Sequence, residues 1–130
     1  MTEFSDALRI ASSGMNAQAS RMRYVSENIA NSDTPGYRRK MVEFEPELAP
    51  GGQSGTVGLG PLMLDRSELS LIHDPGHVLA DETGHYEGSN VDLLVEIADA
   101  REASRSYEAN LKIFDQVRQM STSLMELLRR

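Results

Sequence analysis

The chain has 130 residues, of which 39% are hydrophobic, with no cysteine, no tryptophan and a formal net charge of −7. Its length suits one domain, and the lack of cysteine excludes disulfide bonds and thiolate metal sites. Residues 41–90 carry one basic and nine acidic side chains, whereas the two ends are near neutral. This distribution argues against nucleic acid as a main partner, because such binding neutralises phosphates with basic side chains.

The N-terminal third has the pattern of one long helix, predicted over residues 3–31. Its apolar side chains recur at alternating steps of four and three residues, and only Gln18 interrupts the series. Such a strict seven-residue repeat is typical of a coiled-coil seam. Gly14 costs about 1 kcal/mol relative to alanine inside a helix, so we expect another helix backbone to approach it closely. The predicted seam residues of this helix are Leu8, Met15, Met22, Val25 and Ile29.

The helix is predicted to stop sharply in the segment Asn28–Tyr37, which reads Asn-Ile-Ala-Asn-Ser-Asp-Thr-Pro-Gly-Tyr. Asn, Ser, Asp and Thr side chains compete with helical hydrogen bonds, and Pro35 disfavours helix at the residue before it and lacks an N–H. Because Gly36 turns freely, the Thr-Pro-Gly-Tyr sequence predicts a β-turn. We expect Pro35 and Gly36 to fix the direction in which the chain leaves the helix.

Residues 37–88 are predicted to form an extended or β-hairpin insert, too small and too acidic to hold much core of its own. Residues 37–44 have strand composition, and Pro46 and Pro50 are expected to end that strand. The Gly/Pro-rich residues 49–61 are predicted to be flexible.

The rest of the insert shows weaker signals of secondary structure. One or two short strands are predicted between residues 62 and 72, with turns at residues 73–77 and 81–84. The cluster Arg38-Arg39-Lys40 is the one basic patch of the chain, and we interpret it as solvated or facing another subunit.

A second long helix is predicted over residues 89–130. It opens with Ser89 and Asp92 at the spacing of a capping box. The seven-residue repeat continues along it, with a phase shift at Val117 of the kind called a stammer in coiled coils. The predicted seam residues of this helix are Ile97, Tyr107, Leu111, Phe114, Leu124 and Leu128.

The expected fold is therefore mainly α, with long N- and C-terminal helices pairing as an antiparallel coiled coil around a short extended or β-hairpin insert. The predicted divisions are residues 1–36, 37–88 and 89–130. Because further apolar side chains remain on the far sides of both helices and helix propensity alone gives little stability, we expect the core to be completed by other subunits.

Catalytic, cofactor-binding and metal sites are not expected, and an enzyme is disfavoured. No phosphate-binding loop or nucleophile elbow is present, and the paired carboxylates lack the apolar surroundings that raise a pKa. His73, His77 and His85 form the sharpest alternative, a metal-dependent enzyme, which would require the three imidazoles to converge. A cytoplasmic coiled-coil adaptor is a second alternative: the first residues show no signal-peptide pattern, and no apolar run is long enough to span a bilayer.

The segment that ends the first helix closely resembles the N-terminal signature of the bacterial flagellar axial proteins, the family of rod, hook and hook-associated subunits. Residues 11–18 resemble the first helix of that family, and residues 74–77, 90–92 and 102–110 resemble one proximal rod member in particular. This chain passes directly from Asp33 to Thr34, where many relatives of that member carry extra residues, so a sibling proximal rod subunit stays open as an alternative. The motif residues that carry the resemblance are Asn28, Ala30, Asn31, Thr34, Pro35, Gly36 and Tyr37.

The resemblance implies a structural subunit of the proximal rod in the flagellar basal body. Such subunits stack helically into the drive shaft that transmits torque and encloses the export channel, with both terminal helices in the inner coiled-coil layer. The implied partners are other copies of the chain, neighbouring rod proteins, the component that joins the rod to the inner-membrane ring, and the flagellar type III export apparatus. The resemblance also implies a periplasmic location reached without a cleavable signal peptide, and neither nucleic-acid binding nor membrane insertion is expected.

Overall fold

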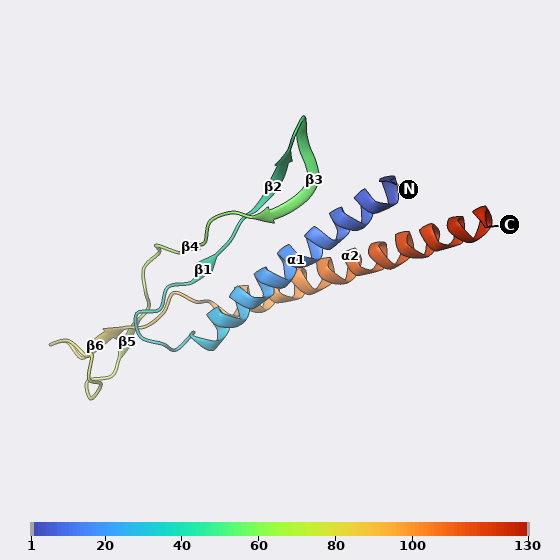
Figure 1. Ribbon diagram of the computed structural model, residues 1–130. Coiled ribbons are helices and arrows are strands. Elements are labelled where there is room, and N and C mark those ends of the chain that lie inside the picture. The colour runs from blue at the N-terminus through green and yellow to red at the C-terminus, as the bar shows by residue number, and fades with distance from the viewer. Residues whose placement is uncertain (1, 130) are drawn as a thin grey trace.

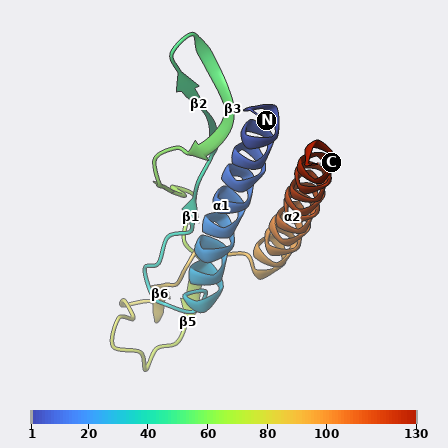
Figure 2. The ribbon, with the colours of Figure 1, turned by 45° about the vertical axis from the view of Figure 1, so that its right-hand side comes forward.

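The computed structural model describes residues 2–129, the side chain of Gln53 excepted, so Met1 and Arg130 of the predicted helical segments lie outside the described residues. Two long helices, α1 (Thr2–Ala30) and α2 (Leu93–Leu128), make up about half of the chain. They lie side by side and antiparallel, with the N- and C-termini at the same end (Figures 1 and 2). The predicted pairing of two terminal helices is confirmed. Within residues 2–129, neither helix combines the length and apolarity needed to cross a membrane.

Three short two-stranded antiparallel sheets lie between the helices in the sequence. The pairs are β1 (Lys40–Met41) with β4 (Met63–Leu64), β2 (Phe44–Ala49) with β3 (Gly52–Leu59), and β5 (Leu71–His73) with β6 (His85–Glu87). The short strands predicted between residues 62 and 72 are confirmed. The single strand predicted over residues 37–44 is wrong, because that segment is interrupted after β1 and enters a separate hairpin.

Residues 49–61, predicted to be a flexible segment, contribute instead to a regular hairpin of β2 and β3. Gly51 and Gly52 adopt φ values of +94° and +135° and supply its turn. Pro46 does not end the strand but lies within β2, where a register irregularity between Pro46 and Leu48 accommodates it. The Gly/Pro content therefore builds a turn, which composition alone did not separate from a linker.

The hairpin rests on the N-terminal half of α1 (Figure 1). The backbone N–H of Val57 donates to Oγ of Ser13 at 3.1 Å. A Cβ atom at Gly55 would lie 2.9 Å from Cδ1 of Ile10, so the glycine leaves room for this side chain. Within the hairpin, Thr56 is buried and donates to the carboxylate of Glu47 at 2.7 Å.

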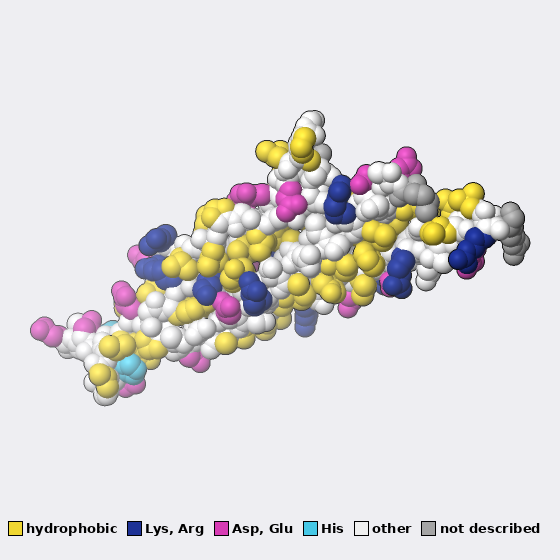
Figure 3. Space-filling view, viewed as in Figure 1, with side chains coloured by type: hydrophobic (Ala, Val, Ile, Leu, Met, Phe, Trp, Pro, Cys, Tyr) yellow, Lys and Arg dark blue, Asp and Glu magenta, His cyan; other side chains and the backbone are white. Residues whose placement is uncertain are grey.

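The contact between the helices is narrow and built largely from small side chains. The buried hydrophobic residues of the helices are Ala11, Ala17, Val25 and Ala103. A Cβ atom at Gly14 would lie 2.8 Å from Nδ2 of Asn110 on α2, so α2 does approach this glycine, through a side chain rather than through its backbone. This narrow contact leaves many large apolar side chains on the surface of the helix pair (Figure 3).

The start of α2 differs from the predicted capping box. Asp92 is the N-cap, and its carboxylate accepts from the N–H of Leu94 at 3.0 Å. Ser89, instead of capping, is buried and donates its hydroxyl hydrogen to the carbonyl of Ser32. The predicted cap at Ser89 is wrong because that hydroxyl ties the approach to α2 to the segment that leaves α1.

Candidate functional site

Asn28, the first residue of the signature segment, connects three parts of the chain. Its side chain is 1% exposed. Its Oδ1 accepts from the hydroxyl of Tyr37 at 2.8 Å and from the backbone N–H of Lys40 at 2.9 Å. Its Nδ2 donates to the carbonyl of Lys40 at 3.0 Å and to the carboxylate of Glu96 at 3.3 Å. All the hydrogen-bonding capacity of one amide is therefore used to join α1, the outgoing chain and α2.

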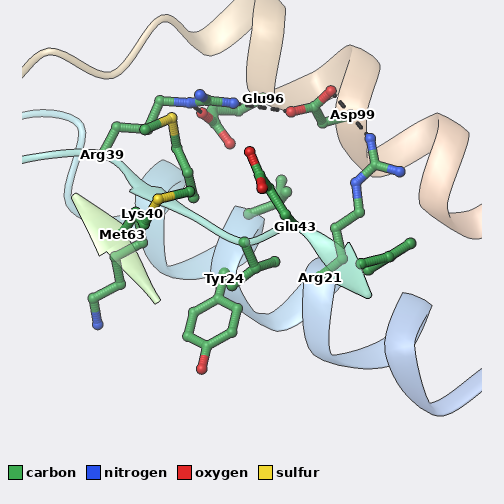
Figure 4. A pocket seen from close by; sticks show the side chains of 12 residues that line it. Arg21, Tyr24, Arg39, Lys40, Glu43, Met63, Glu96 and Asp99 are labelled. Carbon is green, nitrogen blue, oxygen red and sulfur yellow. Dashed lines mark hydrogen bonds and ion pairs between the residues drawn. The ribbon is translucent and has the colours of Figure 1, made fainter. Parts of the chain in front are cut away.

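A set of alternating charges extends from this amide across the helix pair (Figure 4). Glu96 is fully buried and accepts from Nε of Arg39, whose Nη2 donates to Asp99 at 3.0 Å. Arg21 reaches Asp99 from α1 at 3.3 Å. A buried carboxylate is costly unless it is paired and hydrogen-bonded, and Glu96 meets both conditions. We call this set the junction; its members are Arg21, Asn28, Tyr37, Arg39, Glu96 and Asp99.

The electrostatics of the junction keep its donors protonated. Burial lowers the pKa of Arg39, but its hydrogen bond with Glu96 and the nearby negative charges outweigh burial and leave that pKa above its ordinary value. Burial raises the pKa of Tyr37, and the positive charge of Lys40 opposes this only in part. The phenol therefore stays a hydrogen-bond donor to Asn28 at neutral pH.

The predicted turn after α1 is confirmed in detail. The N–H of Tyr37 donates to the carbonyl of Thr34 at 3.2 Å, and Gly36 has φ of +74°. Proline at the second position and a positive φ at the third define a type II turn. The N–H of Gly36 also donates to the carbonyl of Gly88 at 3.0 Å, which ties the turn to the segment between β6 and α2.

Two further motif residues stabilise the end of α1. Nδ2 of Asn31 donates to the carbonyl of Glu27 at 2.8 Å, and the hydroxyl of Thr34 donates to Oδ1 of Asn31 at 3.1 Å. Ala30 and Pro35 are exposed. The motif therefore acts mainly through its polar members and its turn geometry.

The side chains of the basic cluster that follows the turn are paired within the chain, and whether the cluster also faces another subunit stays a prediction. Arg39 belongs to the junction, and Nζ of Lys40 pairs with Glu27 at 2.7 Å. Nη1 of Arg38 donates to the carbonyls of Asp65 and Ser67 at 3.2 and 3.0 Å. Sequence reasoning missed these contacts because the partners lie up to 60 residues away in the chain.

Asn90 is a second asparagine that sequence reasoning did not assign to the site. Its Oδ1 accepts from the N–H of Arg39 at 2.6 Å, and its Nδ2 donates to the carbonyl of Asp65 at 2.9 Å. The only sequence signal was its place in the Asn90-Val91-Asp92 motif. It repeats at the entry to α2 the linking role that Asn28 has at the exit from α1.

The predicted seam residues lie at different depths. Val25 is buried, and Leu8, Met15, Met22, Tyr107 and Phe114 are half-buried. The other predicted seam residues are exposed. They are Ile29, Ile97, Leu111, Leu124 and Leu128, with exposed fractions of 36, 44, 40, 37 and 73%. Whether they form seams between subunits stays a prediction.

Several of these residues share one face of the helix pair. At 3.6 residues per turn, Leu8, Met15 and Met22 lie on the side of α1 opposite to Ile10 and Ser13, which contact the hairpin. Likewise, Ile97 and Leu111 lie on the side of α2 opposite to the acidic residues that meet Arg21. We call this half-exposed face the apolar stripe; it consists of Leu8, Met15, Met22, Ile29, Leu93, Ile97 and Leu111.

The three histidines lie on or near the β5–β6 hairpin. The rings of His73 and His85 meet edge to face with centroids 4.7 Å apart, and His77 stacks on Tyr86 at 3.9 Å. Among residues 2–129, no three His, Asp or Glu side chains are arranged to hold a metal ion.

A cavity of about 320 Å³ opens beside the junction, between α1, α2 and β1 (Figure 4). Met41, Met63 and Phe44 supply apolar walls, and the carboxylate of Glu43 points into it. Its arginines are already engaged by Glu96 and Asp99. The cavity therefore borders the junction without presenting a nucleophile–base pair.

Comparison with known proteins gives matches at both ends of the chain. A family model described as flagella basal body rod protein matches residues 8–38, and one described as flagellar basal body rod FlgEFG protein C-terminal matches residues 82–127. The chain is 43% identical to the flagellar basal-body rod protein FlgC of Agrobacterium fabrum, over 99% of this chain and 98% of that protein.

More distant relatives carry the same name. The FlgC proteins of Salmonella typhimurium and Bacillus subtilis are 33% and 31% identical to this chain. The matches cover 91% and 98% of this chain, and 92% and 99% of those proteins. These relatives favour FlgC over the sibling proximal rod protein, FlgB.

Proposed function

Because the chain belongs to the FlgC family of flagellar basal-body rod proteins and is thus a structural rod subunit, not an enzyme, we propose that copies of it stack helically as the proximal rod. In this proposal the terminal helices form coiled-coil seams around the axial channel, and the insert of residues 37–88 lies outside them and bridges to neighbours. The assembly transmits torque mechanically and needs no cofactor.

The observation that carries this proposal is the apolar stripe. Its members are spread over both helices, yet Leu93, Ile97 and Leu111 stay 40–47% exposed in the single chain. Contiguous exposed apolar surface on this scale marks an interaction site. Covering it with the helices of further copies supplies the packing that two isolated helices lack.

The junction suits a subunit that bears load. Its charged hydrogen bonds are stronger than neutral ones, and they bind α1, α2 and the segment just before β1 to one another at the base of the helix pair. We propose that they hold the two helices in fixed register while torque passes through the seams.

The family assembles with other rod components in the basal body. We further propose contacts with the component that joins the rod to the inner-membrane ring, and export into the periplasm by the flagellar type III apparatus. The divisions at residues 36 and 88 are retained in this proposal, since the junction lies where all three parts meet.

The substitution Leu111→Asp tests the seam. Burying a new carboxylate between copies is strongly unfavourable, so we expect loss of rod assembly and at least a tenfold smaller swimming zone, with normal expression. The measurements are motility in soft agar and immunoblotting of isolated basal bodies.

Leu94→Asp is the matched control, because Leu94 is 79% exposed and lies on a different side of α2. It should swim normally. Circular dichroism of both purified variants separates an assembly defect from a folding defect. Normal swimming by Leu111→Asp would contradict the proposal that Leu111 lies in a seam between subunits.

A further inference from the structure

The strand β2 leaves one edge of its hairpin uncovered. All six of its residues are exposed, and among the described residues it pairs with β3 alone. In both ribbon views β3 lies between β2 and α1 (Figures 1 and 2), so the far edge of β2 faces solvent. An exposed strand edge carries unpaired N–H and C=O groups that can pair with a strand of another chain.

The hydrogen bonds around the hairpin show which residues of β2 direct their backbone groups to this edge. The N–H of Gly60 donates to the carbonyl of Glu43 at 2.8 Å, so these residues form a hydrogen-bonded pair. Bonded and non-bonded pairs alternate along antiparallel strands, which makes Pro46 and Val57 a non-bonded pair. The N–H of Val57 agrees with this assignment, because it donates to Oγ of Ser13 on α1 and not to β2.

Pro46 removes the central donor of the open edge. Because backbone direction alternates along a strand, the residues whose backbone groups point outward are Phe44, Pro46 and Leu48. Proline has no N–H, so the middle position offers a carbonyl alone. If two copies of β2 pair antiparallel about this residue, the two prolines lie opposite each other, and both hydrogen bonds of that pair are lost.

The acidic side chains of β2 oppose the same pairing. In the register centred on Pro46, Glu45 of one copy lies opposite Glu47 of the second copy, and this happens twice. Like charges directly opposite each other destabilise a strand pair. Residues 41–61 contain three acidic side chains and neither Lys nor Arg to offset them.

We propose that Pro46 blocks the open edge of β2 and so keeps the free chain from pairing with β2 of a second copy. Proline and charged side chains on exposed edges have this effect in β-sheet proteins generally. Pairing of β2 with β2 joins identical surfaces about a two-fold axis and therefore closes a dimer, which cannot continue as an open helical stack. The block acts on the free chain and does not depend on how copies meet in the rod.

Replacing the proline tests the block. Pro46→Val supplies the missing N–H and a β-branched side chain, and it leaves the bonds to β3 in place because this N–H points outward. In sedimentation velocity, we expect the purified variant to dimerise at least tenfold more tightly than the natural chain. Amide exchange at Phe44 and Leu48 should slow at least tenfold in the dimer. Pro46→Thr is a second variant, and circular dichroism checks that both keep their helices.

Pro61→Val is the matched control, because Pro61 is exposed and lies between β3 and β4. It should associate no more than the natural chain. Pro46→Val/Leu48→Pro moves the proline to another outward position of the same edge and should return association to the natural level.

The block would be overturned by unchanged association of both Pro46 variants or by equal dimerisation of Pro61→Val. A double variant that still dimerises, or dimers without slower exchange at Phe44, would also overturn it. None of these results bears on the proposed function, because every protein is compared as a free chain.

Discussion

At the scale of single residues, two asparagines and one buried ion pair fix how the helices meet. Asn28 satisfies its whole amide and so joins α1 to residues 37–40 and to α2. Asn90 joins Arg39 to residues 65–67 at the entry to α2. Glu96 is fully buried, and Arg39 bridges it to Asp99. A lysine in place of Arg39 has no planar fork with which to reach both carboxylates.

The junction makes a testable prediction about Glu96. Glu96→Ala leaves Arg39 with Asp99 alone and removes one acceptor from Asn28, and breaking a buried pair in this way costs about 3–5 kcal/mol. Urea unfolding followed by circular dichroism measures the loss in free energy of unfolding.

Glu102→Ala provides the comparison on the same helix. Glu102 also accepts from Arg21, at 3.4 Å, but its side chain is 69% exposed, and exposed pairs contribute about 0–1 kcal/mol. Equal losses for the two variants would show that the buried pair has no special role.

At the scale of elements, small and polar side chains make the contact between the two helices, where the sequence pattern predicted an apolar seam. The side chain of Asn110 packs against Gly14, and Ala103 is fully buried. Gln18, the residue that interrupts the apolar series, has its Oε1 buried with no hydrogen-bond donor among the described residues. An unsatisfied buried polar group costs about 1–3 kcal/mol.

Replacing this glutamine should therefore stabilise the pair. Gln18→Leu removes the unsatisfied oxygen and completes the heptad, so we expect a gain of about 1 kcal/mol and a higher melting temperature, read by circular dichroism. Asn16→Leu, at an exposed position of the same helix, should leave the melting temperature almost unchanged. A lower melting temperature for Gln18→Leu would mean that this oxygen has a partner that the single chain does not show.

The local elements were largely predictable, and their long-range contacts were not. The bounds of α1 and the Thr-Pro-Gly-Tyr turn follow from hydrophobic period and turn chemistry, both of which are local. A hairpin in the insert was expected, but its turn at residues 51–52 was assigned to a flexible segment because glycines at positive φ serve turns and linkers alike. The junction was missed because the partners of Arg38 and Arg39 lie in distant segments, and charge clusters in sequence carry no sign of pairing.

At the scale of the whole molecule, the part that is well stabilised within one chain and the part that is left exposed lie at opposite ends of the helix pair. The base of the helix pair holds the junction, the type II turn and two of the three small sheets. At the free ends of the helices, large apolar side chains remain exposed, among them Met120, Leu127 and Leu128 at 53, 65 and 73%. Our account is that the base folds within one copy and that the apolar stripe and free ends are completed by the rod.

Amide hydrogen exchange tests this account most directly, by comparing purified monomer with protein in isolated basal bodies. We predict slow exchange in the monomer near the junction, at residues 22–30 and 96–103, and fast exchange at residues 2–10 and 115–129. Assembly should slow amide exchange in these end segments at least tenfold, because their exposed side chains become buried between copies. End segments already as protected in the monomer as in the rod would contradict the account and would show a helix pair that is complete on its own.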